Sequence, residues 1–204
     1  MFNDFFLSHN RIDTSHSTLP KDNPLPDITL DHIVATEEEI SDLTRSIDET
    51  KASGHDGISP KLLKQAGQSI VPSFTKLINL SLSKAKVPNS WKKANVIPIH
   101  KKDSKDDMNN YRPVSILPSC SKLLEQVVFK HVYNFFHTNN LLTKHQSGFR
   151  PGDSTVNQLA YLYHVFSEAL DKKKDVRIVF CDVSKAFDKV WHEGLLYKLK
   201  MIGI

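Results

Sequence analysis

Residues 176–190 read Val-Arg-Ile-Val-Phe-Cys-Asp-Val-Ser-Lys-Ala-Phe-Asp-Lys-Val, and this stretch decides how the chain is interpreted. Residues 178–181 form an apolar run, the pattern of a strand that is buried on both faces. The carboxylate of Asp182 follows directly, so we expect it at the exit of that strand, where clefts form and divalent cations bind. The aromatic Phe187 and a second carboxylate, Asp188, come next. The stretch therefore predicts a buried strand that ends in an acidic site.

A lone aspartate after a strand has an ordinary interpretation, which is that it caps the following turn. Ala186, Phe187 and Asp188 follow Asp182 in the same stretch. Asp188 lies beyond the turn, and we interpret it as a residue that caps or pins that turn.

Composition sets limits on the class of protein. The 204 residues suffice for one or two domains, and 39% hydrophobic with 25% charged residues is typical of a globular protein. The net charge of +4 is compatible with a nucleic-acid partner without requiring one. Two cysteines, Cys120 and Cys181, exclude a disulfide framework, and we expect both to be buried free thiols in a reducing compartment. No apolar run reaches membrane-spanning length and no signal peptide is evident, so an intracellular location, cytoplasm or nucleus, is expected.

Local signals predict a mixed α+β fold with more helix than strand. A capping box at Thr36 and Glu39 begins one helix, and Ser59-Pro60 and Gly67 bracket another. Further helices are expected over residues 70–84, 121–138 and 154–172 and from Glu193 onward. Residues 94–99 and 111–117 are expected to pair as a hairpin, with Pro98 restricting its strand to an edge or a bulge. Residues 1–31 have a short apolar opening, and Pro20, Pro24 and Pro26 predict an extended linker in the later part.

The stretch from Phe180 to Val190 resembles the first palm motif of reverse transcriptases, in the form typical of non-LTR (LINE-type, jockey-like) retrotransposons. Tyr111-Arg112-Pro113 and Gly148-Phe149-Arg150 match further motifs of this family, in the family's order. The resemblance implies helix-rich fingers with a β-hairpin, followed by the first strand and helix of a right-hand polymerase palm, truncated. It implies residues 1–35 as a linker, 36–175 as a fingers-like region and 176–204 as the start of the palm.

The chemistry implied by the resemblance uses two Mg²⁺ ions roughly 4 Å apart. Asp182 and the backbone carbonyl of Val183 match two of the family's metal ligands, whereas the others belong to a Tyr-x-Asp-Asp hairpin. After Asp182 the sequence offers only Asp188 and Glu193 as acids, so the site is half present. Asp106 and Asp107 are adjacent, but they lie in a charged loop with no strand before it.

The resemblance also assigns nucleotide-binding and template-binding residues. Lys101, with Lys102 as the close alternative, and Arg112 match the cations that grip the triphosphate of a deoxynucleotide. Phe187 matches an aromatic gate that excludes a 2′-hydroxyl. Gly148 and Arg150 match a loop near the template backbone. The ordinary alternatives are a solvated hairpin tip, a core aromatic and a plain loop before a helix, respectively.

The sequence is therefore interpreted as a partial reverse transcriptase domain, whose implied partners are an RNA template, a DNA primer and deoxynucleotides. Because its catalytic site is incomplete, these 204 residues alone are expected to be inactive. The alternatives are a non-catalytic nucleic-acid-binding or interaction module derived from a retroelement, and a longer product that continues past Ile204.

Overall fold

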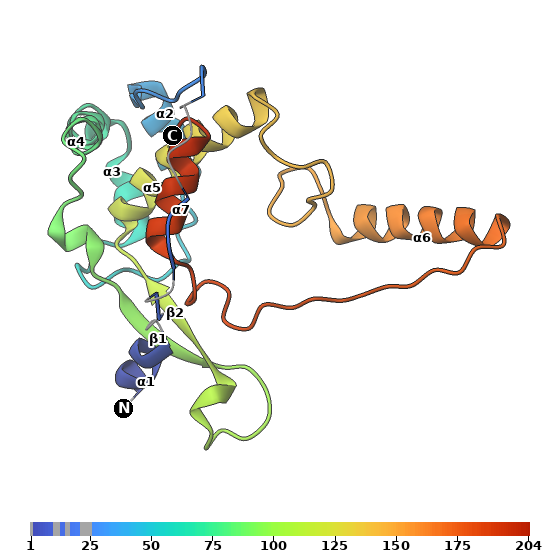
Figure 1. Cartoon of the computed structure of the whole chain (residues 1–204). Helices are drawn as coiled ribbons and strands as arrows, with labels where there is room; N and C mark the ends of the chain where they lie inside the picture. Colours follow the sequence, from blue (N-terminus) through green and yellow to red (C-terminus); the bar gives the residue numbers. More distant parts are fainter. Residues whose placement is uncertain (1, 10–12, 15–16, 21–25) are drawn as a thin grey trace. The chain divides into compact units, whose positions relative to one another are not determined.

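A computed structural model describes residues 2–9, 13–14, 17–20 and 26–204 of the chain (Figure 1). Within these residues the fold is mixed α+β, with seven α-helices and one two-stranded antiparallel sheet. This confirms the predicted α+β class. The chain divides into two compact units, Met1–Phe135 with Phe187–Ile204 (unit 1) and Phe136–Ala186 (unit 2), and each is described by itself.

Unit 1 contains most of the regular structure. Its elements are α1 (Phe2–His9), α2 (Glu37–Arg45), α3 (Pro60–Ala66), α4 (Val71–Ser83), β1 (Asn95–His100), β2 (Tyr111–Ile116), most of α5 (Ser119–Thr138) and α7 (His192–Met201), with short 3₁₀ turns η1 (Gly67–Ser69), η2 (Asn89–Lys92) and η3 (Met108–Asn110). Unit 2 contains the end of α5 and α6 (Thr155–Asp171). No helix among the described residues is both long enough and apolar enough to cross a lipid bilayer.

Two helices begin where the sequence predicts. The Thr36 hydroxyl accepts the N–H of Glu39 at 3.1 Å at the start of α2. The Ser59 hydroxyl accepts the N–H of Leu62 at 3.1 Å at the start of α3. Each hydroxyl satisfies a backbone donor that has no partner inside the helix, so the caps fix where α2 and α3 start.

The other half of the predicted capping box does not form, because Glu39 points toward α5. Its side chain is only 7% exposed and lies 3.1 Å from the ammonium of Lys130 and 3.3 Å from Nε2 of His131. Glu39 Oε1 has no partner with hydrogen-bond geometry among the described residues, so the nearby Lys130 charge is what offsets the burial of this oxygen. The carboxylate thus ties α2 to α5 instead of closing its own cap.

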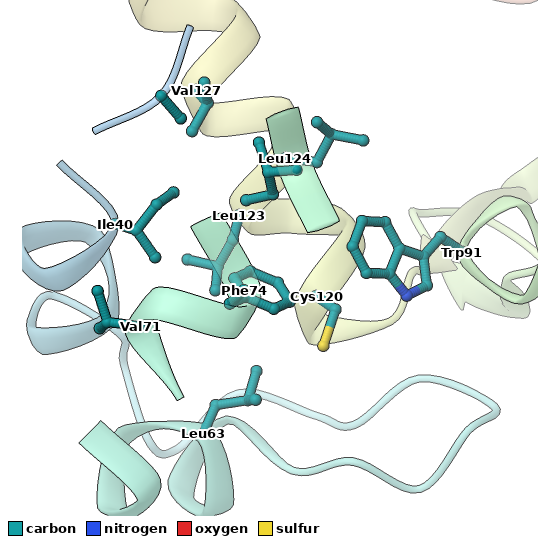
Figure 2. Packing of buried hydrophobic residues seen from close by; sticks show 11 residues of the cluster. Ile40, Leu63, Val71, Phe74, Trp91, Cys120, Leu123, Leu124 and Val127 are labelled. Carbon is teal, nitrogen blue, oxygen red and sulfur yellow. The ribbon is translucent and has the colours of Figure 1, made fainter. Parts of the chain in front are cut away.

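The hydrophobic core of unit 1 is formed by α2, α4 and α5 (Figure 2). Ile40, Ile78 and Val127, one from each helix, are completely buried. The Trp91 ring, from η2, lies 5.8 Å from the Phe74 ring between centroids, and both are buried. The chain that leads from α4 into β1 is therefore anchored to the core.

The predicted hairpin is confirmed by the pairing of β1 with β2. The register runs from Asn95 opposite Ile116 to His100 opposite Tyr111, and it places Pro98 directly opposite Pro113. Beyond the strands, the Lys101 N–H donates to the Asn110 carbonyl at 2.7 Å, which extends the ladder by one pair. Each strand has a single neighbour in this sheet, so Pro98 lies on an edge strand as expected.

The short apolar opening of the N-terminal segment, for which no element was predicted, forms helix α1. The Phe2 ring meets the Tyr111 ring edge-on at 4.8 Å between centroids, and it stacks on Phe6 at 5.8 Å. This contact with a residue far along the sequence supplies burial that the local composition does not reveal. The middle of the proline-rich stretch, residues 21–25, lies outside the described residues.

The expected strand over residues 178–181 is not formed, which corrects the sequence interpretation. These residues lie in an irregular segment, and Phe180 is 87% exposed. A strand exists only where a neighbour supplies partners for its backbone groups, and the one sheet among the described residues is β1–β2. The expected burial of the Cys181 thiol is wrong for the same reason, since that residue is exposed.

Helix α6 forms where it was predicted, and the hydroxyl of Ser154 caps it by accepting the N–H of Asn157 at 3.2 Å. Its predicted apolar face, however, is not packed within unit 2. None of its residues is buried, and Val156, Leu159, Tyr163 and Leu170 are exposed.

Candidate functional site

The β1–β2 hairpin brings two of the predicted cations to one face. Paired residues in an antiparallel sheet share a face, and alternate residues along a strand return to it. Arg112 is paired with Ile99, and Lys101 follows Ile99 by two positions, so Lys101 and Arg112 lie on the same side at the end of the hairpin. Both are exposed, and neither side chain forms an ion pair or hydrogen bond with another described residue.

Lys102 differs from Lys101 in two respects. It lies in a bend beyond the last pair of the ladder, and its ammonium lies 3.9 Å from the carboxylate of Asp103. Its charge is therefore partly offset by a neighbour, although an exposed pair of this kind is weak. The geometry favours Lys101 as the partner of Arg112.

The loop between these two cations is held by side chains that flank them. His100 Nε2 donates to the Asp103 carbonyl at 3.1 Å, and the Tyr111 hydroxyl donates to the Lys105 carbonyl at 3.0 Å. Asn110 Nδ2 donates to the Ser104 carbonyl at 2.8 Å. Sequence reasoning missed these residues as positioning groups; the only signal was that His100 and Tyr111 directly precede Lys101 and Arg112.

The predicted template loop is a compact turn ahead of α6. Arg150 is half-buried, and its Nη1 donates to the Thr143 carbonyl at 3.3 Å. The Ser147 hydroxyl donates to Oε1 of Gln158 in α6 at 2.6 Å. Gly148 has open space where a Cβ would point, so another molecule can approach its backbone. Gly148 and Arg150 are thus placed together, beside a hollow that also borders the first turn of α6.

Asp153 adds a negative charge to this loop. Its pKa is held below the ordinary value, chiefly because the carboxylate accepts the backbone N–H of Ser154, with smaller contributions from Ser147 and from the Arg150 charge. Together with Ser154 it forms the helix start that was the ordinary alternative for this loop. Capping accounts for Asp153 and Ser154, and the guanidinium of Arg150 bonds to Thr143 and attracts the Asp153 carboxylate.

The described residues do not provide a complete metal site. Asp182 and Val183 are exposed in the irregular segment of unit 2, and no group of three or more His, Cys, Asp or Glu side chains is gathered within the part of the chain that the structure describes. Mg²⁺ requires near-octahedral coordination by oxygen atoms. One carboxylate and one carbonyl do not satisfy this requirement, so these two residues by themselves do not form a catalytic metal centre.

Phe187 is 82% exposed, which contradicts the alternative that it is a core aromatic. It borders a hollow in unit 1 whose lining includes Asp188, Trp191 and Glu193. Asp188 lies within the turn that precedes α7, rather than beyond it.

The two thiols differ in environment, and this predicts different reactivity. Burial, with a smaller contribution from the Asp56 charge, raises the pKa of Cys120 to about 11, whereas Cys181 is exposed. Because the thiolate is the reacting form, at pH 8 roughly one part in a thousand of Cys120 is reactive. With Ellman's reagent the native protein is expected to release one equivalent quickly and a second slowly. Cys181→Ser should remove the fast phase, and two equally fast thiols would contradict the structure.

Comparison with known sequences defines the class. The profile of the reverse transcriptase (RNA-dependent DNA polymerase) family matches residues 99–204, just over half of the chain. The matched region begins in β1 and contains the hairpin loop, the Gly148 loop and Asp182. The chain therefore belongs to the reverse transcriptase family.

Individual relatives come from mobile elements, as the resemblance to non-LTR retrotransposons implies. The chain is 34% identical over 166 residues to the probable RNA-directed DNA polymerase from transposon BS of Drosophila melanogaster, a match that covers 81% of this chain and 18% of the relative. It is 31% identical over 180 residues to the RNA-directed DNA polymerase from mobile element jockey of the same species, covering 88% of this chain and 19% of the relative. The chain thus spans about a fifth of the length of these relatives.

Proposed function

We propose that this chain forms the part of an RNA-directed DNA polymerase that holds the triphosphate of the incoming deoxynucleotide and contacts the RNA template. The observation that carries the proposal is the placement of Lys101 and Arg112 on one face of the hairpin, both without a charge partner among the described residues. Residues 36–175 serve as the fingers-like region in this proposal, residues 1–35 as a linker and residues 176–204 as the start of the palm.

The chemistry of the hairpin suits a triphosphate. A planar guanidinium donates two parallel hydrogen bonds to phosphate oxygens, and an ammonium adds a mobile point charge. Negative charge builds on the leaving pyrophosphate during nucleotidyl transfer, and cations already fixed near it stabilise that transition state. The hydrogen bonds from His100 and Tyr111 hold the loop, so the backbone that carries the two cations needs little reorganisation on binding.

The other site residues have supporting roles in the proposal. Phe187, exposed beside a hollow, is proposed to exclude ribonucleotides by its contact with the sugar. Gly148 and Arg150 are proposed to contact the template backbone. Asp182 is proposed as a catalytic carboxylate and, with the Val183 carbonyl, as a ligand of Mg²⁺ once the remaining ligands are supplied by other residues.

The experiment is steady-state primer extension on an RNA template. The protein is this chain joined to the region that follows the matched segment in the jockey polymerase. Arg112→Ala is expected to raise KM for the deoxynucleotide by about 10- to 100-fold, because a hydrogen bond to a charged group contributes about 1.5–3 kcal/mol. Arg112→Lys should recover part of the loss.

Lys102→Ala provides the matched control, since Lys102 lies in the bend beyond the ladder and beside Asp103. It is expected to change KM by less than about threefold, in line with the small contribution of an exposed ion pair. An Arg112→Ala protein with normal KM would overturn the proposed role of the hairpin.

A further inference from the structure

The positive charge of the chain is concentrated in one segment. Residues 57–102 contain nine of the 27 lysines and arginines and none of the 23 aspartates and glutamates. The remainder of the chain is therefore net negative, and the modest overall charge of +4 conceals a strongly basic region. All nine basic residues in this segment are lysines.

Five of these lysines belong to one stretch of unit 1, which we call the α4–η2 lysine surface. It runs from α4 through the following turn and η2 to the start of β1 (Figure 1), and all five side chains are exposed: Lys76, Lys84, Lys86, Lys92 and Lys93. None of the five forms an ion pair with any residue that the structure describes, whereas Lys64 pairs with Glu49 and Lys102 with Asp103.

The backbone that carries these lysines is held in place. At the end of α4 the Lys86 N–H donates to the Ser81 carbonyl, and the Ser81 hydroxyl donates to the Lys86 carbonyl, both at 3.0 Å. Buried Trp91 packs on Phe74 (Figure 2) and anchors η2. Lys92 lies on η2. Lys84 and Lys86 border the same hollow. The lysines are thus presented from a fixed scaffold.

We propose that the α4–η2 lysine surface binds the phosphate backbone of a nucleic-acid strand, as a contact separate from the hairpin and from the Gly148 loop. This role rests on the proposed function and deepens it, because the template and primer of a polymerase are polyanions that a basic surface can bind. Lysines act as point charges that fix a strand without reading its sequence. A protein interface would be expected to present arginine or exposed aromatic anchors, and this surface has no arginine and keeps its tryptophan buried.

The test is equilibrium binding of the 204-residue chain to fluorescently labelled single-stranded RNA, single-stranded DNA and DNA duplex over a range of salt concentrations. The triple variant Lys84→Gln, Lys86→Gln, Lys92→Gln is expected to bind at least about tenfold more weakly than wild type at low salt. The slope of log affinity against log salt should fall by about 0.7–0.9 for each phosphate that the variant no longer neutralises. Comparing the three oligonucleotides distinguishes a template-like strand from a duplex.

The matched control is Lys172→Gln, Lys173→Gln, Lys174→Gln, which removes the same charge from an exposed run after α6. It is expected to leave affinity within about twofold of wild type. Equal losses of affinity in both variants would show that only net charge matters and would overturn the proposal. An unchanged affinity of the α4–η2 variant would also overturn it. Polyglutamate that competes as well as RNA would assign the surface to acidic proteins and also overturn it. Thermal unfolding checks that both variants stay folded.

No free deoxynucleotide is present in this binding assay, and the triple variant keeps Lys101 and Arg112, so the difference between variant and wild type does not depend on the proposed triphosphate site. A failure of the proposed function appears as a normal nucleotide KM in Arg112→Ala. A failure of the lysine surface appears as undiminished oligonucleotide binding when the α4–η2 lysines are removed.

Discussion

Asp182→Asn is expected to abolish primer extension, with a loss on the order of a thousandfold or more, in the polymerase that joins this chain to the following region of the jockey enzyme. The substitution keeps the shape of the side chain and removes its negative charge. Asp182 is exposed and is not part of the core of either unit, so the fold has no need of the carboxylate. A loss of this size would therefore report on the reaction.

The matched control is Asp188→Asn, which removes a carboxylate six positions later in the same motif. Asp188 is half-buried in the turn before α7, and its replacement is expected to lower stability slightly while extension persists. Circular dichroism of both variants separates loss of structure from loss of chemistry. Asp182→Asn enzyme that still extends primers at a normal rate would show that the catalytic carboxylate lies elsewhere.

Leu123→Ala is expected to lower the free energy of unfolding by about 2–5 kcal/mol, a large share of the stability of a small domain. Leu123 is 2% exposed and lies in the cluster formed by α2, α4 and α5. Truncation removes buried methyl groups and leaves a cavity that the neighbouring helices cannot fill completely. Chemical denaturation followed by tryptophan fluorescence measures the change, because buried Trp91 belongs to the same cluster.

Leu80→Ala is the control for this substitution. Leu80 lies on α4 and is 54% exposed, so its truncation removes less buried surface and is expected to cost under about 1 kcal/mol. A similar loss in the two variants would contradict the burial of Leu123 in the core formed by α2, α4 and α5. A loss of unfolding free energy confined to Leu123→Ala would support the described core.

The elements that sequence predicted well depend on local signals. Thr36 and Ser59 cap helices through hydrogen bonds to residues three positions away, and the hairpin follows from two short apolar runs around a charged loop. The features that sequence analysis missed depend on contacts between residues far apart in the sequence. Helix α1 packs against Tyr111, and the Glu39 carboxylate pairs with α5; neither partner is visible in the local pattern.

The strand expected before Asp182 shows the limit of a local apolar pattern. Residues 178–181 have the composition of a buried strand, but burial and pairing require neighbours that the described residues do not supply. For the candidate site, the motif spacing predicted Lys101 and Arg112, and the hairpin places them on one face. The loop contacts of His100 and Tyr111 could not be predicted, because they depend on the conformation of residues 103–105.

Pro98 and Pro113 face each other across the hairpin, and neither has an N–H to donate. The bond from Lys101 to Asn110 fixes the alternation of the ladder, so this proline pair occupies a position whose N–H groups would point outward, away from the partner strand. Each outer edge therefore lacks its central donor. Such an edge resists the addition of a third strand from another molecule. The hairpin can expose Ile97, Ile99 and Val114 to solvent without becoming a template for edge-to-edge polymerisation.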